Sequence, residues 1–324
     1  MSLTIAANPE SSGALGDSVM LPEVVVVATR YSQSWLDTNS AVQVDREELD
    51  RRGANDLSGL VKYDPLLSLP FDFSSGDGAF GYGGSGYSGF NIRGVEGNRI
   101  AIELDGIRQP PQYVSTSFDQ GSDGGAGGVG RDYFDPAMFD LVEILKGGSS
   151  ALYGSDAIGG VVSMQTLQAE DLLKERDYGG LVRTQHFSVN DGFAGQIGGA
   201  VRSGDFEFLL LYAGRTGHET KNNGSIPPNP VDFQSQAILA NANYIHGEHR
   251  FELTMENYQR ETDIDARSAT TSTFKVFDKS VLNFEQIQRQ RVGLKWKYNF
   301  ASTWIDHLES HLYLQKADTE SLNQ

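Results

Sequence analysis

From Tyr178 to the end of the chain, apolar and polar residues alternate in segments of about ten residues, the length of a membrane-crossing strand. In one segment, Phe251, Leu253 and Met255 alternate with Glu252 and Thr254. Since side chains on a β-strand point alternately to opposite faces, this period of two predicts strands with one apolar and one polar face.

The connections between these segments alternate in length. The short turn His246-Gly247-Glu248 lies between two long polar stretches, at 217–234 and 262–285. Alternating short and long connections are typical of an outer-membrane β-barrel, and a soluble β-sandwich is the alternative. We expect about seven strands, too few to close a barrel around another domain, because diameter grows with strand number.

The composition excludes several classes of function. The net charge of −17, from 43 acidic and 26 basic residues, argues against nucleic acid as a partner. The absence of cysteine excludes thiol catalysis and cysteine-based zinc sites. No apolar stretch approaches the ~20 residues of a transmembrane helix. The first residues lack the pattern of a signal peptide, so we expect it to have been removed or to lie upstream.

The region before Tyr178 contains tight glycine turns between short apolar strands. Arg93-Gly94 and Asp105-Gly106 flank the alternating run 99–104, and Lys146-Gly147 follows a second strand at 141–146. Asp-Gly adopts positive φ at low cost and indicates a hairpin. Val42 to Asp50 predicts a strand running into a helix with Asp45 as N-cap. These patterns predict a small α+β domain.

The order of these motifs resembles the plug domain of TonB-dependent outer-membrane receptors, in the branch that handles haem, haemoglobin and transferrin. The plug motif comprises Arg93, Gly94, Asp105, Gly106, Lys146 and Gly147. The resemblance implies an α+β plug at 21–170 after a flexible arm at 1–20. Antiparallel transmembrane strands of an incomplete barrel then follow at 171–324. The family has Arg-Gly-Pro where this chain has Lys146-Gly147-Gly148, which puts a buried plug-to-wall ion pair there in doubt.

Four consecutive valines follow a glutamate near the start of the predicted plug, within 22–29. The resemblance implies that Glu23, Val24, Val25, Val26 and Val27 form the TonB box, which pairs with the energy-coupling protein TonB by strand addition in the periplasm. The alternative is a first edge strand of the domain.

Two long glycine-rich loops, 69–90 and 110–131, interrupt the predicted plug. They carry the aromatic residues Phe80, Tyr82, Tyr87 and Tyr113, which suit a flat or iron-bearing ligand. In the family, such loops form the ligand-facing tip of the plug, and plain surface loops are the alternative. Four carboxylates in and just after the second loop could bind Ca²⁺ or simply face solvent, and we favour the solvated interpretation: Asp119, Asp123, Asp132 and Asp135.

A haem ligand set cannot include a histidine of the plug, because the first histidine of the chain is His186. Tyr82, Tyr87 or Tyr113 could serve as an axial ligand of haem iron, and His218 is the best-placed histidine of the following region. No metal site or catalytic constellation stands out, so we expect no enzyme activity and no intrinsic cofactor.

These observations predict a receptor in the outer membrane of a Gram-negative bacterium, with the plug and the arm facing the periplasm. The expected partners are TonB, outer-membrane lipid, and haem, haemoglobin or another iron or haem carrier, with haem or an iron chelate as transported ligand. We expect a monomer. The alternatives are a siderophore or cobalamin receptor of the same family, or a binding fragment that does not transport.

Overall fold

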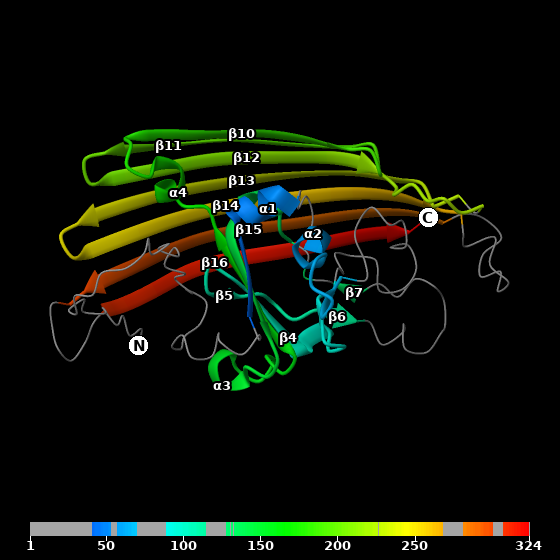
Figure 1. Ribbon diagram of the computed structural model, residues 1–324, viewed down its shortest axis with the longest axis horizontal. Helices are drawn as coiled ribbons and strands as arrows, with labels where there is room; N and C mark the ends of the chain where they lie inside the picture. The colour runs from blue at the N-terminus through cyan, green and yellow to red at the C-terminus, as the bar shows by residue number, and fades with distance from the viewer. Residues whose placement is uncertain are drawn as a thin grey trace, which may run out of the picture.

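The computed structural model describes most of the chain in two parts, a plug of short elements and a wall of long strands (Figure 1). The predicted arm at 1–20, the TonB box at Glu23–Val27, and Phe80, Tyr82 and Tyr87 all lie outside the described residues. The described residues are 41–52, 57–69, 89–114, 128–129, 131, 133–225, 227–267, 281–300 and 307–323.

The plug is built on a five-stranded mixed sheet with the strand order β1-β8-β9-β4-β5. Only the pair β4 and β9 is parallel. Strand β4 is apolar except for Glu103 and is buried at every position, as expected for a strand covered on both faces. The bounds of the strands are β1 Ala41–Asp45, β4 Ile100–Leu104, β5 Ile107–Arg108, β8 Phe139–Lys146 and β9 Gly160–Thr166.

Short helices and two-residue strands connect this sheet. Helix α1 (Arg46–Arg52) begins where predicted, because the amide of Glu48 donates to Asp45 Oδ1 at 2.8 Å. The other elements are α2 Leu57–Val61, β2 Leu67–Ser68, β3 Asn91–Ile92, η3 Gly97–Arg99, β6 Tyr113–Val114, β7 Gly128–Val129, η4 Pro136–Met138, α3 Ser150–Tyr153 and α4 Ala169–Leu173.

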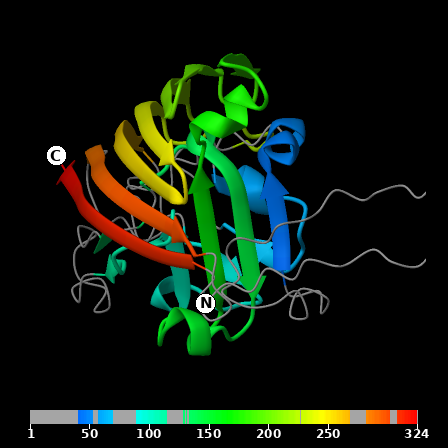
Figure 2. The ribbon, with the colours of Figure 1, turned by 90° about the vertical axis from the view of Figure 1, so that its left-hand side faces the viewer.

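The wall is a seven-stranded antiparallel sheet in which each strand pairs with the next along the chain. Its first and last strands are not paired with each other among the described residues, so the sheet is open. Figure 2 shows it curving round one side of the plug. Its strands are β10 Tyr178–Phe187, β11 Gly192–Ser203, β12 Phe206–His218, β13 Val231–His246, β14 His249–Ala266, β15 Val281–Asn299 and β16 His307–Asn323.

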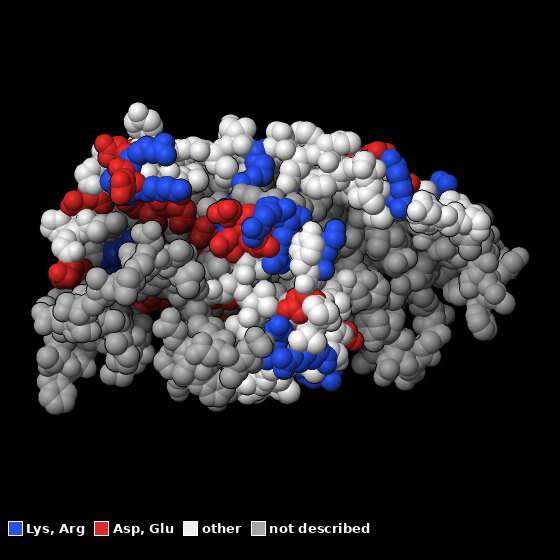
Figure 3. All heavy atoms as spheres, in the orientation of Figure 1, with Lys and Arg blue, Asp and Glu red and all other residues white. Residues whose placement is uncertain are grey.

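The two faces of the wall differ as the alternation predicts. On the face turned away from the plug, Leu210 is 62% exposed, whereas Leu211 on the plug side is buried. The upper edge of the molecule in Figure 3 accordingly shows mostly uncharged atoms between charged ends. No helix in the described part of the chain is long and apolar enough to cross a membrane.

Aromatic side chains gather on the outward face at the end of the wall that carries the short turns. Neighbouring rings lie with centroids from 4.8 to 6.5 Å apart. The rings are those of Phe206, Tyr244, Phe251, Trp296 and Tyr298. An aromatic row at the edge of an apolar band is what a transmembrane β-sheet shows at the lipid–water interface.

The main hydrophobic core runs from the plug into the wall. Plug residues such as Ile102 and Phe139 belong to the same buried cluster as Leu211, Leu239 and Ile287 of the wall. The inward face of the wall is therefore not uniformly polar, because some of the positions that face the plug carry aliphatic side chains. The plug and the wall form a single packed unit.

Helix α4 links the last plug strand to the wall. The amide of Gln168 donates to the Asp171 carboxylate at 2.6 Å, and Arg250 of β14 pairs with Glu170 at 3.0 Å. Burial, together with the nearby charge of Asp140, raises the pKa of Asp171 to about 6. The linker is thus fixed to the wall by charge as well as by its chain connection.

Gly160 at the start of β9 tests how tightly the plug sheet is packed. Its φ is +155°, and a Cβ there would lie 2.3 Å from the carbonyl oxygen of Leu145. We expect Gly160→Ala to destabilise the plug by about 3 kcal/mol or more, because backbone atoms must move. Calorimetry of the full-length receptor measures this as a lowered plug transition.

Gly148→Ala is the matched control, since its Cβ would meet its nearest neighbour at an ordinary 3.7 Å and its φ is not positive. Equal melting of Gly160→Ala and Gly148→Ala would show that the close approach at β9 is not a constraint.

Candidate functional site between the plug and the wall

The Asp105-Gly106 turn joins β4 to β5 with two residues of positive φ, at 50° and 78°. This is the hairpin geometry expected for an Asp-Gly pair. The Asp105 carboxylate accepts hydrogen bonds from the Thr166 amide at 2.8 Å and from its hydroxyl at 2.9 Å. The turn is thereby tied to the end of β9.

The same carboxylate also binds the wall. Arg291 on β15 donates from Nη2 to Asp105 Oδ2 at 2.5 Å, and its Nε donates to Glu256 on β14 at 3.1 Å. Burial alone would raise the pKa of Asp105, but the Arg291 charge and the Thr166 hydrogen bonds outweigh burial and hold the pKa below its ordinary value. Asp105 is therefore a charged link between the plug and the wall.

A second arginine extends this cluster. Arg289, fully buried, forms an ion pair with Glu256, and its guanidinium lies 4.8 Å from the ring centroid of Phe134 in the plug. A cation over an aromatic face is attracted by the ring quadrupole, more strongly when desolvated. Two arginines, one glutamate and one aspartate thus balance their charges at the interface.

A second group of contacts holds the plug segment that enters β8. Arg215 of β12 binds the Asp135 carboxylate through two nitrogens, at 2.6 and 2.8 Å. Gln196 of β11 donates to the carbonyl of Ala137 at 2.6 Å and accepts from Arg46 at 2.8 Å. Such forked arginine–carboxylate contacts are strong and directional.

Asp135 is thus not a solvated carboxylate, as the sequence reading favoured, but a buried partner of an arginine. Its side chain also accepts from the Ala137 amide at 2.8 Å and caps η4. The error has a physical cause, because the partner lies 80 residues away on the wall. Asp119, Asp123 and Asp132 lie outside the described residues.

The remaining motif residues meet within the plug. Lys146 pairs with Asp64 at 2.8 Å. Burial alone would raise the pKa of that carboxyl, but hydrogen bonds from Lys146 and the Leu66 amide, with the charges of Lys146 and Arg93, hold the pKa below its ordinary value. A Cβ on Gly147 would lie 3.9 Å from the Arg93 guanidinium. The structure therefore brings Arg93, Lys146 and Gly147 together, whereas Asp105 and Gly106 form the separate wall contact. The ion pair of Lys146 in the described residues is with the plug and not with the wall.

Of the predicted ligand-binding residues, the structure describes two in part. Tyr113 lies in β6, paired with Val129 of β7, and only its backbone is described. His218 ends β12 on the outward face, where its Nδ1 lies 2.6 Å from Asp232 Oδ1. Figure 1 places the β6–β7 pair toward the end of the wall where β12 and β16 finish. Tyr113 therefore belongs to the plug, whereas His218 lies on the outward face of the wall.

The wall residues of the interface were missed by the motif search. All four lie on inward-facing positions of the alternation: Arg215, Glu256, Arg289 and Arg291. Their parity identifies them as inward. The sequence does not reveal their partners in the plug, since Arg215 and Asp135 are 80 positions apart and Arg291 and Asp105 are 186 positions apart.

Comparison with known proteins agrees with this architecture. Residues 36–161 match the family profile described as the TonB-dependent Receptor Plug Domain. The chain carries the plug of a TonB-dependent receptor. The FrpB iron transporter from Neisseria meningitidis (F3-3 variant) superimposes with a TM-score of 0.68, covering 87% of this chain and 41% of that chain at 18% identity. At that identity, the likeness shows the fold alone.

Two curated relatives are similar in sequence. Lactoferrin-binding protein A of Neisseria meningitidis serogroup A is 29% identical over 227 residues, covering 68% of this chain and 23% of the relative. Hemoglobin-haptoglobin utilization protein B of Neisseria meningitidis serogroup C is 33% identical over 211 residues, covering 62% of this chain and 24% of that relative. The chain thus spans about a quarter of the length of these relatives. The family consists of transport receptors and not of enzymes.

Neutralising Asp105 tests the wall contact. Asp105→Asn keeps a residue that tolerates positive φ but leaves Arg291 without its plug carboxylate, so we expect a loss of about 2–3 kcal/mol in plug attachment. Proteolysis of the plug across a urea titration of the full-length receptor measures it. Because the pKa of Asp105 is lowered, the contribution of this carboxylate is full above about pH 4 and is lost as the pH falls further.

Asp156→Asn is the matched control. Asp156 pairs with Arg108 at 3.1 Å on the exposed side of the plug, where an ion pair contributes less than about 1 kcal/mol. If the two variants released the plug at the same urea concentration, the Asp105–Arg291 contact would not be what holds it.

Proposed function

We propose that this chain is the plug and the adjoining wall of an outer-membrane receptor that takes up iron or haem from a host carrier protein. The observation that carries the proposal is the plug match together with relatives named for lactoferrin and for haemoglobin–haptoglobin. Those names share one feature, an iron- or haem-bearing protein as the partner. The outward apolar face and aromatic row of the wall support a position in the outer membrane.

The energy for uptake would come from TonB in the periplasm, through the segment Glu23–Val27. That segment precedes β1, an edge strand that pairs with β8 over five residues. A pull on the N-terminal side is transmitted first to β1 and then to Arg46, which binds the carbonyl of Phe139 and the wall residue Gln196. The plug can yield there while Asp105 and Asp135 still hold it to the wall.

Haem is the finer proposal for the ligand. Tyr82, Tyr87, Tyr113 and His218 are the candidates for contact with it, and Phe80 adds an aromatic surface in the same loop. Tyrosine and histidine both serve as axial ligands of haem iron. The alternative within the family is a ferric siderophore or cobalamin, which would require none of these ligands.

A Val25→Pro variant tests the TonB box. Proline removes a backbone donor from a paired strand, so we expect iron uptake from the carrier to fall to background while carrier binding is unchanged. Growth on carrier-bound iron, with binding measured on the same cells, is the readout. Val25→Ala is the control and should transport normally. Full uptake by Val25→Pro would place TonB engagement elsewhere.

A Soret titration of the full-length receptor with hemin tests the ligand. We expect a saturable shift that is lost in one of Tyr82→Ala, Tyr87→Ala, Tyr113→Ala or His218→Ala, because losing an axial ligand changes the iron coordination. Haemoglobin is titrated in parallel. Absence of a hemin shift and of a haemoglobin complex would favour a siderophore or another small chelate.

A further inference from the structure

A groove of about 520 Å³ opens on the outward face of the wall between β10 and β14. One cross-strand row forms its floor, in which Thr184 pairs with Gly195, Gly195 with Gly214, and Gly214 with Gln236. Two glycines side by side remove two outward side chains from the apolar face. The groove is a local hollow in an otherwise continuous band.

Two aromatic rings lie along the glycines. A Cβ on Gly214 would meet the Tyr212 hydroxyl at 3.2 Å, and a Cβ on Gly195 would meet the Phe193 ring at 3.6 Å. Each ring therefore leans over the glycine two positions along its own strand. Tyr212 is 44% exposed and Phe193 51%, so both present ring surface to a ligand in the groove. The electron-rich face of an aromatic ring attracts the positive C–H edges of a sugar.

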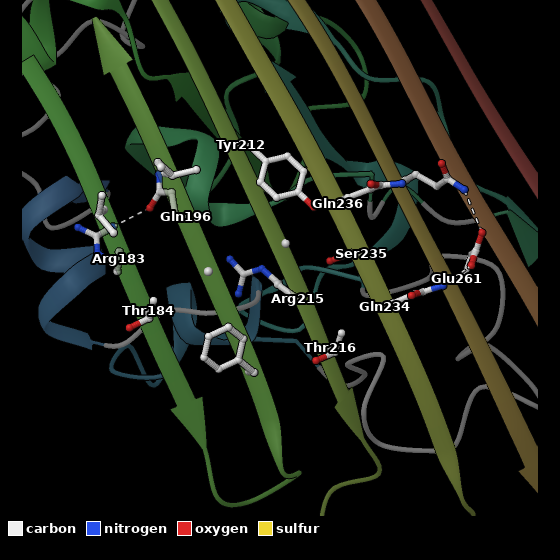
Figure 4. A pocket seen from close by; sticks show the side chains of 16 residues that line it. Arg183, Thr184, Gln196, Tyr212, Arg215, Thr216, Gln234, Ser235, Gln236 and Glu261 are labelled. Atoms are coloured by element: carbon white, nitrogen blue, oxygen red, sulfur yellow. Dashed lines mark hydrogen bonds between the residues drawn. The ribbon is translucent and has the colours of Figure 1, made fainter.

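The far side of the groove is polar. Gln234, Gln236 and Gln259 line it together with Glu261, as Figure 4 shows for the labelled residues. Gln234 and Gln259 both donate to the Glu261 carboxylate, at 2.6 and 3.0 Å. The side chain of Gln236 has no hydrogen-bond partner among the described residues. Amides and a carboxylate can donate to and accept from hydroxyl groups.

A second groove, of about 480 Å³, lies further along the same strands toward the short turns. Small outward residues such as Gly199, Ala240 and Ala242 form it, between Phe208 and Met255. On β11 it begins at Gly199, two residues beyond Ile197 of the first groove, which corresponds to about 7 Å along a strand. One face of the wall thus offers a polar groove with an aromatic surface, followed by an apolar groove.

We propose that these two grooves together bind one glycolipid, with its sugar head group in the first and an acyl chain in the second. The proposal rests on the outer-membrane position proposed above. The succession of polar and apolar surface matches an amphiphile that lies along the strands. Three charged residues line the first groove, and two of them point toward the plug: Arg215 pairs with Asp135, and Arg183 donates to Gln196. The third, Glu261, faces outward, so an uncharged sugar head group fits better than a phosphate.

The test uses the full-length receptor in bilayers of phosphatidylethanolamine that contain equal parts of glucosyl-diacylglycerol and phosphatidylglycerol with the same acyl chains. Native mass spectrometry after gentle release counts the retained lipids. We expect retained glucosyl lipid to exceed phosphatidylglycerol at least about tenfold, and Gln234→Ala combined with Gln236→Ala to reduce that ratio about tenfold. Tyr212→Ala should act in the same direction, because it removes the ring.

Gln290→Ala is the matched control, an outward amide on β15 that does not line the groove. Its lipid ratio should equal that of the unaltered receptor. Equal retention of the two lipids, or equal loss in Gln290→Ala and in the groove variants, overturns the glycolipid site. Carrier-dependent iron uptake is measured in the same groove variants. If lipid retention contradicts the glycolipid site while uptake is unchanged, the proposed receptor function still stands, because that function fails only if uptake or membrane insertion fails.

Discussion

The structure depends on buried charges that join the plug to the wall. Asp105 lies in a plug turn and Asp135 caps η4, and each pairs with an arginine from a different wall strand. Removing one partner of such a pair leaves a charge buried and unpaired, which is far more costly than the pair itself is stabilising. The contacts therefore specify one position of the plug. Hydrophobic packing alone, across Leu209, Leu211 and Leu239, would tolerate small displacements.

These two ion pairs, the anchors of the plug, hold one part of it to the wall more firmly than the part that contains β1. Both lie on the parts of the plug near β4, β5 and the start of β8, whereas β1 is an edge strand with a single neighbour. Arg46 is the exception, because it connects the first helix to Gln196 and to the carbonyls before β8. Under the pull proposed for the N-terminal segment, force would therefore reach β1 and Arg46 before it reached the anchors. Local opening of weakly held elements is how packed proteins move without global unfolding.

The sequence predicted local features well and distant partners poorly. Alternation assigned the faces of the wall strands, and Asp45 and the Asp105-Gly106 pair indicated a helix start and a turn, because each depends on neighbours within a few residues. Asp135 was misread as solvated, since nothing near it in the chain reveals Arg215. The sequence left in doubt whether Lys146 forms an ion pair with the wall. In the structure its ion pair is with Asp64 of the plug.

The glycines also show that the sequence reveals local roles better than roles that depend on distant residues. At Gly106, positive φ accounts for the residue, and the Asp-Gly pair announces it in the sequence. Gly195 and Gly214 have no such backbone requirement, and each sits alone among strand residues. Their meaning appears only when register places them opposite each other, beside Tyr212 and Phe193. A groove on a sheet depends on which residues are paired across neighbouring strands, so the sequence of a single strand does not predict it.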